Sequence, residues 1–330
     1  MKKSSENSDV LISIVIPVKN GSSTLRSCLD GIFSQTLISS TEVIVIDSGS
    51  NDGTLEILET YPLKVHQIEP REFNHGSTRN LGVSLSKGRF VVMTVQDATP
   101  ADDKWLETML KHFDDTQVAG VCGQQIVRHD ADKNPLQWFK PRGEADIICY
   151  RFEDPAVFER MPGKEQHSYC NWDDVNAMYR KEFLEKIPFH HISFGEDTLW
   201  ARDALSAGYA IVYDYSARVY HYHHQNFRFY FKRTFIIHYQ TYKFFNYIRF
   251  SGNVIKKLAV MSVRIRRLPM SRKEKCYWWR YNLNIIMARA WATWQFSLIS
   301  RFQGMEGIEK ALKRKVGLPP QGVQNKPKTL

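Results

Sequence analysis

The sequence has few cysteines, and none of them has the spacing of a metal site. Its five cysteines, an odd number, are scattered over 330 residues without a CxxC pair. This pattern argues against a disulfide-stapled secreted fold and against a structural zinc site. A reducing cytosol is therefore the expected compartment.

Long apolar runs are also missing. The most apolar late segment, residues 281–300, is interrupted by Asn282, Asn284, Arg289 and Gln295, so it falls short of the roughly 20 apolar residues that a spanning helix needs. The first ten residues are polar and lack the apolar stretch of a secretory signal, and we interpret them as a disordered leader. The chain is predicted not to cross a membrane.

The glycine-rich motifs of common nucleotide-binding folds are absent as well. The first strand-like run ends in PVKNGS, which matches neither GxGxxG nor GxxxxGK[ST]. A dinucleotide-binding fold and a P-loop are therefore poorly supported.

Acidic residues are almost missing from the last third of the chain. Residues 1–225 carry 23 Lys and Arg against 32 Asp and Glu, a net charge of −9, whereas residues 226–330 carry 22 against 3, a net charge of +19. Such asymmetry suggests an anionic surface or polymer as the partner of the second part alone. It also indicates a boundary near residue 225.

Strand-like and helix-like segments alternate in the acidic part. Residues 11–18, 42–46, 64–68 and 90–95 read as strands, and residues 22–33 and 52–60 read as helices. This order predicts an α/β fold with a mostly parallel mixed sheet and flanking helices. Ligands of such sheets lie at the carboxyl ends of the strands.

Three polar residues follow these strands directly. Asn20, Asp47 and Asp97 each come just after a strand end, so they are expected at one rim of the sheet. A single Asp in this position is more often a cap of the next turn or helix. Three polar groups at one rim favour a ligand site.

Six motifs in order resemble the inverting GT-A glycosyltransferases of family 2, and among them the bacterial rhamnosyltransferases of surface polysaccharide synthesis. They are SIVIPVKNG, VIVIDSGSNDGT, EFNHGSTRNLG, VVMTVQDATP, DDVNAMYRKEFLEKIPF and FGEDTLWARDALSAGY, and ARVYHYHH follows them. The pair FNHGSTRN and QDA points to rhamnose. The resemblance implies the GT-A (nucleotide-diphospho-sugar transferase) fold over residues 1–225.

The resemblance also implies a nucleotide-sugar site. Pro17, Asn20 and Asp47 would hold the base and ribose of the donor. His75, Gly76 and Arg79 would lie near its diphosphate, where a guanidinium suits phosphate geometry. The alternative for this last loop is a helix start capped by Ser77 or Thr78, with Arg79 in solvent.

A divalent metal, Mg²⁺ or Mn²⁺, is expected beside the diphosphate. GT-A enzymes usually carry Asp-x-Asp at this strand end, but here the triplet is Gln96-Asp97-Ala98. Asp97 would bind the metal, and Gln96 would add a carbonyl oxygen or act through water. His221 is the best match for a further ligand, with His223 next; a polar sheet edge is the alternative for this His-rich stretch.

The resemblance assigns the acid–base chemistry to FGEDTLWARDALSAGY. Asp197 would be the general base that deprotonates the acceptor hydroxyl, with Glu196 and Asn176 binding the acceptor. Both acidic residues open a helical pattern, where the helix dipole favours ionised carboxylates. Ordinary first-turn acidic residues are the alternative.

Residues 226–330 interleave aromatic and basic residues and are expected to form a helical extension with a disordered tail at 318–330. Amphipathic basic helices of this kind lie on anionic leaflets. The alternatives are nucleic-acid binding, for which no motif appears, and packing on the protein itself.

The sequence thus predicts a metal-dependent inverting rhamnosyltransferase. It would use dTDP-L-rhamnose and a lipid-linked glycan acceptor, as a cytoplasmic protein peripheral on the inner face of the bacterial plasma membrane. The alternatives are a transferase of the same fold that uses a UDP-sugar, and a noncatalytic sugar- or nucleic-acid-binding protein.

Overall fold

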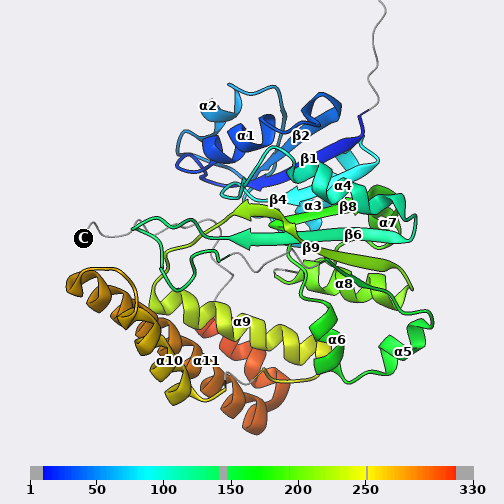
Figure 1. Ribbon diagram of the computed structural model, residues 1–330. Coiled ribbons are helices and arrows are strands. Elements are labelled where there is room, and N and C mark those ends of the chain that lie inside the picture. Colours follow the sequence, from blue (N-terminus) through cyan, green and yellow to red (C-terminus); the bar gives the residue numbers. More distant parts are fainter. Residues whose placement is uncertain (1–9, 141–146, 193, 250–251, 317–330) are drawn as a thin grey trace, which may run out of the picture. The chain divides into compact units, whose positions relative to one another are not determined.

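The computed structural model describes residues 10–140, 147–192, 194–249 and 252–316. Its contacts divide the chain into two units. Figure 1 labels the helices and strands. The first unit comprises residues 1–126, 142–161 and 168–221, and the second comprises 127–141, 162–167 and 222–330. The predicted boundary at 225 lies near the last change of unit, but the two inner segments of the second unit were not foreseen. The proposed leader at 1–10, apart from Val10, and the proposed tail at 318–330 lie outside the described residues.

One mixed sheet forms the centre of the first unit. Within the described residues it has nine strands in the order β3-β2-β1-β4-β8-β6-β9-β5, with β7 paired to β9. The strands are β1 (Ile12–Val18), β2 (Thr41–Asp47), β3 (Lys64–Gln67), β4 (Phe90–Thr94), β5 (Thr99–Pro100), β6 (Val118–Ile126), β7 (Ile147–Tyr150), β8 (Asn176–Arg180) and β9 (Ala210–Tyr220).

Helices connect these strands. They are α1 (Leu25–Phe33), α2 (Thr54–Leu58), α3 (His75–Leu85), α4 (Trp105–Leu110), α5 (Pro155–Arg160), α7 (Lys181–Lys186) and α8 (Glu196–Ser206), with short 3-10 turns η1 (Ile38–Ser40) and η2 (Lys111–Asp114). Helix α6 (Gly163–Tyr169) contributes residues to both units. The α/β fold with flanking helices is confirmed, and the four predicted strands and two predicted helices agree with β1 to β4, α1 and α2 within a few residues.

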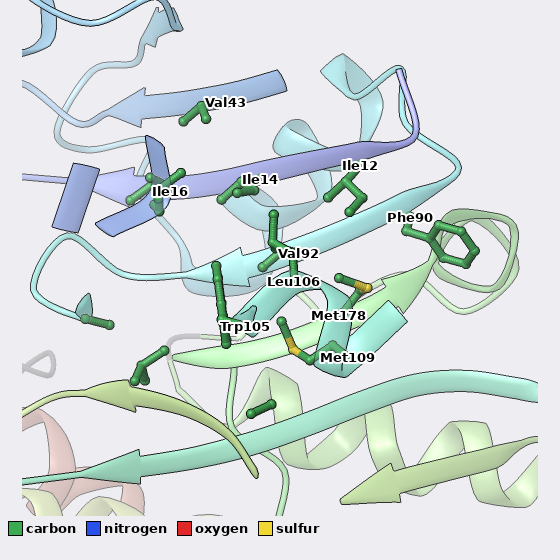
Figure 2. Close-up of a cluster of buried hydrophobic side chains, with 14 of the residues drawn as sticks. Ile12, Ile14, Ile16, Val43, Phe90, Val92, Trp105, Leu106, Met109 and Met178 are labelled. Carbon is green, nitrogen blue, oxygen red and sulfur yellow. The ribbon is translucent and has the colours of Figure 1, made fainter. Parts of the chain in front are cut away.

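The core between the sheet and one layer of helices is made by alternate strand residues. Ile12, Ile14 and Ile16 of β1 lie beside Val92 of β4 and Met178 of β8, and α4 adds Trp105, Leu106 and Met109 (Figure 2). Alternate residues of β1 face the opposite layer: a Cβ on Gly82 of α3 would lie 2.2 Å from a methyl of Val15. Helices therefore cover both faces, as a largely buried sheet requires.

The direction of each strand decides which residues meet at the rim. Strands β1, β2 and β4 run parallel, so their carboxyl ends lie together. Strand β8 is antiparallel to β4 and to β6, and β9 is parallel to β6. The rim therefore also receives the ends of β6 and β9, which run in the same direction as β4, and the start of β8, which the rule for parallel sheets did not predict.

The second unit is helical. It contains α9 (Phe227–Phe245), α10 (Val254–Arg266), α11 (Arg272–Ala311) and the π-helical turn η3 (Leu312–Val316). Helix α9 packs along α11, with Phe235 and Phe296 rings 5.2 Å apart, and α10 packs on α11 around Trp278. The inner segment 127–141 belongs to this unit because Leu136 packs against the same cluster and Asn134 hydrogen-bonds Asn282. The predicted helical extension is thus observed.

Among the residues that the structure describes, no helix is both long enough and apolar enough to cross a membrane.

Candidate active site

Two loops at the rim, those after β1 and β2, are joined by hydrogen bonds that involve their side chains. The backbone N–H of Asn20, which follows β1, donates to Ser50 Oγ at 2.8 Å, and Asn20 Oδ1 accepts the N–H of Asn51 at 2.9 Å. The side chain of Lys19 donates to the carbonyl of Ser48 at 2.9 Å. The loops after β1 and β2 are therefore held together.

Asp47, at the end of β2, is fully buried and accepts from its own loop. Its Oδ2 accepts the N–H groups of Gly49 and Ser50, each at 3.1 Å, and Oδ1 accepts the hydroxyl of Ser50. This is the turn-stabilising role that a lone Asp after a strand often has. Pro17 is paired with Ile46 in the adjacent strand and is partly exposed.

Gln96 ties the end of β4 to the loop after β1. Its Oε1 accepts the N–H of Lys19 at 2.8 Å and its Nε2 donates to the carbonyl of Lys19 at 3.1 Å. A Cβ on Gly21 would lie 2.9 Å from the Gln96 oxygen, so a side chain there would displace the Gln96 amide. The side-chain carbonyl expected to act beside the metal is instead engaged by the backbone, and we do not retain it as a ligand.

Asp97 and His221 face each other across the rim. Asp97 Oδ1 lies 3.4 Å from His221 Nε2, and each side chain is only 11% exposed. His221 follows β9 directly, and its backbone N–H donates to the carbonyl of Ile126 at 3.0 Å. The structure therefore brings together two residues far apart in the sequence that were predicted as metal ligands. His223 belongs to the second unit.

The donor set fits a divalent cation. A carboxylate oxygen and an imidazole nitrogen are both ligands of first-row divalent ions, and carboxylate suits Mg²⁺ and Mn²⁺. Two neighbouring ligand atoms at about 2.1 Å from an octahedral ion lie roughly 3 Å apart. The observed distance between Asp97 Oδ1 and His221 Nε2, 3.4 Å, is close to this value. Mg²⁺ needs only one or two carboxylates when substrate phosphates complete its shell.

Helix α3 carries the motif HGSTRN, and it begins at His75. Asn74 caps it by accepting the N–H of Ser77 at 3.2 Å, so the alternative in which Ser77 or Thr78 caps the helix is wrong. A Cβ on Gly76 would lie 1.8 Å from the carbonyl oxygen of His190. The missing side chain of Gly76 thus permits the close approach of a protein backbone group.

Arg79 lies in a buried cluster of carboxylates. Its Nε is 2.8 Å from Asp174 Oδ2, and Nη1 pairs with Glu196 Oε1. Arg79 is 5% exposed, which excludes the solvated alternative. Its neighbouring carboxylates outweigh burial and raise the pKa of Arg79. His75 lies beside the cluster, with Nδ1 3.9 Å from Glu196 Oε1.

Asp197 belongs to the same cluster at the start of α8. The cap of α8 is Gly195, in the left-handed conformation with φ 82°, so Asp197 does not cap the helix. Burial, followed by repulsion from Glu196, Asp174 and Asp173, raises the pKa of Asp197 well above its ordinary range, and Arg79 opposes this only in part. Burial and like charges around Asp197 thus oppose the ionisation that the helix dipole would favour.

Asn176 lies in the core. It is 1% exposed, its Oδ1 accepts from Trp105 Nε1 at 2.8 Å, and its Nδ2 donates to the carbonyl of Ala217 at 2.8 Å. Its side chain has no access to an acceptor, and we do not retain it in the acceptor site. The packing of β8 against β6 and β9, which no local pattern revealed, decides this.

Two neighbouring aspartates before β8 have separate partners. Asp173 accepts from Gln125 of β6, whereas Asp174 pairs with Arg79 and accepts from Tyr179. Burial, then the charge of Glu196, raises the pKa of Asp174 despite Arg79. The sequence motif marked both aspartates, but their partners Gln125 and Tyr179 carried no local signal.

The comparisons with known proteins identify the family. The family model "Glycosyl transferase family 2" matches residues 13–188. The chain is 30% identical over 231 residues to the O-antigen chain rhamnosyltransferase RfbN of Salmonella typhimurium, covering 68% of this chain and 70% of that protein. It is 32% identical over 227 residues to the O-antigen chain rhamnosyltransferase WbaN of Salmonella anatum, with the same coverage.

Solved structures share the fold at low identity. TarS 1-349 of S. aureus superposes with a TM-score of 0.51 at 16% identity, covering 87% of this chain and 91% of that chain. A mannosyltransferase from Pyrobaculum calidifontis, in complex with GDP-Man and Mn²⁺, gives 0.52 at 16% identity over 92% of this chain and 78% of that chain. These likenesses confirm the predicted GT-A-like architecture. From the family match, the two Salmonella relatives and this fold, the chain belongs to glycosyl transferase family 2.

Proposed function

We propose that this protein is an inverting glycosyltransferase that moves L-rhamnose from dTDP-L-rhamnose to a hydroxyl of a lipid-linked glycan in surface polysaccharide synthesis. Glycosyltransferase activity follows from the family. The donor and the pathway are supported by the names of the two Salmonella relatives. The observation that carries the proposal is the single rim where Asp97 and His221 lie, together with the carboxylate cluster around Asp197.

In this proposal Asp197 takes the proton of the acceptor hydroxyl, whose oxygen bonds to the anomeric carbon from the face opposite the leaving group. The bond from that carbon to the diphosphate oxygen breaks, the nucleoside diphosphate leaves with the electron pair, and the configuration inverts. A raised pKa suits this role, because a base works best with a pKa near the working pH. Glu196, held by Arg79, would border the acceptor.

Asp97 and His221 would hold Mg²⁺ or Mn²⁺, which would neutralise the charge that develops on the leaving diphosphate. The loops of Pro17, Asn20 and Asp47 would hold the base and ribose of the donor. His75 would border the diphosphate. For Arg79 the ion pairs with Asp174 and Glu196 support an orienting role in the acceptor half instead.

Two alternatives remain as outcomes of a donor screen. A UDP-sugar is the first, since TarS of S. aureus has been solved with UDP-GlcNAc. A noncatalytic binding protein is the second. Release of nucleoside diphosphate from dTDP-L-rhamnose, UDP-GlcNAc and GDP-mannose, each with Mg²⁺ or Mn²⁺, distinguishes the three cases, because a noncatalytic protein releases none.

The metal assignment has its own test. We expect Asp97→Asn to abolish metal-dependent donor binding and turnover, since an amide cannot replace the charge of the carboxylate. Asp103→Asn, at an exposed position shortly after β4, is the matched control and should keep both. Circular dichroism and thermal melting check that both variants fold. Undiminished activity of Asp97→Asn would remove the assignment.

We also propose that the second unit lies on the anionic inner leaflet of the plasma membrane. One face of α11 exposes an apolar stripe spaced as one side of a helix: Met287, Trp291, Trp294, Leu298 and Phe302, with exposed fractions of 37–74%. The rings of Trp291 and Trp294 stack at 4.9 Å. Exposed patches of this kind mark binding surfaces, and the surrounding net charge of +19 over residues 226–330 favours anionic lipid.

A further inference from the structure

A chain of hydrogen bonds leads from His221 into the first unit. His221 Nδ1 lies 2.6 Å from Gln125 Oε1. Gln125 Nε2 donates to Asp173 Oδ2, and Asp173 Oδ1 accepts the backbone N–H of Val175 at 3.0 Å. The three side chains come from the end of β6, the segment before β8 and the segment after β9.

This order of donors and acceptors fixes which tautomer the neutral imidazole of His221 adopts. Asp173 Oδ2 accepts from the NH₂ group of Gln125, which leaves the amide oxygen of Gln125 facing His221. That oxygen can only accept, so Nδ1 of His221 carries a hydrogen. In the neutral ring the lone pair is then on Nε2, the nitrogen that faces Asp97 at 3.4 Å.

The backbone holds this arrangement in place. Strands β6 and β9 are paired in parallel with Gln125 opposite Val219, and the N–H of His221 donates to the carbonyl of Ile126. Asp173 is fixed by its own turn, in which its carbonyl accepts the N–H of Asn176 at 3.2 Å. The next residue, Asp174, is anchored by Arg79. Each of the three hydrogen-bonded residues is therefore also held in place by backbone contacts beyond these hydrogen bonds.

We propose that Gln125, anchored by Asp173, is a positioning residue that presents Nε2 of His221 to the divalent cation. The inference rests on the proposed metal function of Asp97 and His221. Outer partners that orient a histidine ligand typically change metal affinity about 10–100-fold when they are removed. Gln125 therefore sets metal affinity without touching the metal.

The test measures binding of Mn²⁺ in the presence of thymidine diphosphate, by the electron paramagnetic resonance signal of free Mn²⁺, and needs no turnover. Gln125→Met keeps the side-chain length and removes both hydrogen bonds, so we expect affinity to fall about 10–100-fold. Gln124→Met is the matched control, because alternate residues of a strand point to opposite faces. It should bind Mn²⁺ as the unmodified protein does.

A charge swap tests the orientation directly. Gln125→Glu alone faces Asp173 with a second carboxylate and should weaken Mn²⁺ binding. In the double variant Gln125→Glu/Asp173→Asn, the new carboxylate accepts from His221 while the new amide donates to that carboxylate, so affinity should return to within about threefold of the original. Recovery supports the inference even if Gln125→Met fails to fold.

The outcomes separate the two proposals. If the unmodified protein with thymidine diphosphate binds no Mn²⁺, the proposed metal function itself fails. If it binds Mn²⁺ and His221→Ala loses that binding, but Gln125→Met binds normally or the double variant shows no recovery, the role of Gln125 is overturned and the metal site stands.

Discussion

Among single residues, Asp197 has an environment that opposes ionisation. It is partly buried, and three carboxylates lie near enough to raise its pKa, against a single guanidinium. The cap of its helix is a glycine, so a role as cap does not explain an acidic residue here. A carboxylate that is costly to ionise, in a cluster of charged groups, is a candidate for the general base proposed above.

Replacing this carboxylate should therefore affect turnover and its pH dependence. We expect Asp197→Asn to lower turnover by roughly 100-fold or more while donor affinity persists. In the unmodified protein the base must be deprotonated, so the rate should be low below its raised pKa and increase as pH rises through it. This acid limb should lie clearly above the ordinary Asp value of about 3.9.

The measurement is a turnover–pH profile of both proteins, with donor binding followed by calorimetry. A variant with near-normal turnover, or one that keeps the same acid limb, would show that another group accepts the proton.

Among the elements, strand β9 is anchored to the turn after α4 by one buried carboxylate. Asp214 is fully buried, accepts from His112 Nε2 at 2.7 Å, lies 3.1 Å from Lys111 Nζ, and accepts the N–H of Ser216 at 2.8 Å. These partners outweigh desolvation and lower the pKa of Asp214. Since β9 delivers His221 to the rim, this anchor supports the site from outside it.

Asp214→Asn should lower the free energy of unfolding by about 2 kcal/mol at neutral pH, because it removes a charge from a hydrogen-bonded buried cluster. Because the pKa of Asp214 is lower in the folded protein than in the unfolded chain, ionised Asp214 stabilises the fold at pH values above about 3.9, its pKa in the unfolded chain. This contribution to the free energy of unfolding is lost as the pH falls toward the folded-state pKa. The difference between variant and unmodified protein should therefore shrink below about pH 4.

Urea unfolding at a series of pH values measures this difference. Glu185→Gln removes an exposed pair with Lys181 on α7 and is the control, expected within about 0.5 kcal/mol. A constant Asp214→Asn difference from pH 7 to pH 3 would contradict the assignment.

At the scale of the whole molecule, charge and exposed aromatic surface are concentrated in one unit. The buried face of α11 carries Trp278, Ala288 and Phe296, whereas the opposite face carries the apolar stripe with Trp291 and Trp294. The sequence left open whether the aromatic residues of this part pack on the protein itself or face a membrane. The structure divides them: Trp278 is core, and Trp291 and Trp294 are about half exposed.

The second unit should bind vesicles containing anionic lipid and release them as salt rises, because the Debye length falls to roughly 3 Å at 1 M. Neutral vesicles should bind weakly. The electrostatic, salt-sensitive part of vesicle binding should weaken when five exposed basic residues are replaced with Gln: Lys256, Lys257, Arg264, Arg266 and Arg267. Trp291→Gln/Trp294→Gln should weaken binding that survives high salt. Both sets should keep turnover on a soluble acceptor analogue.

Cosedimentation with phosphatidylglycerol vesicles, in competition with duplex and single-stranded DNA, decides the partner. Preference for DNA would favour the nucleic-acid alternative. A concentration-dependent dimer that the tryptophan variant abolishes would instead make the stripe a contact between two copies of the chain.

Local sequence was sufficient for the elements of the parallel half and for the family. β-Branched runs and turn residues predicted β1 to β4, because strand period and turn chemistry act within a few residues. Six motifs in order identified glycosyl transferase family 2, and the charge asymmetry marked a second unit.

Only the tertiary structure decided what the rim side chains do. It turned Gln96 to the backbone of Lys19, placed Asn176 in the core, paired Arg79 with Asp174 and Glu196, and linked His221 to Gln125. The reason is that β8 runs against β4 and β6 while β9 runs with β6, so residues distant in the sequence meet at one edge. Hydrogen bonds and desolvation depend on distance in space, and no local pattern carries that distance.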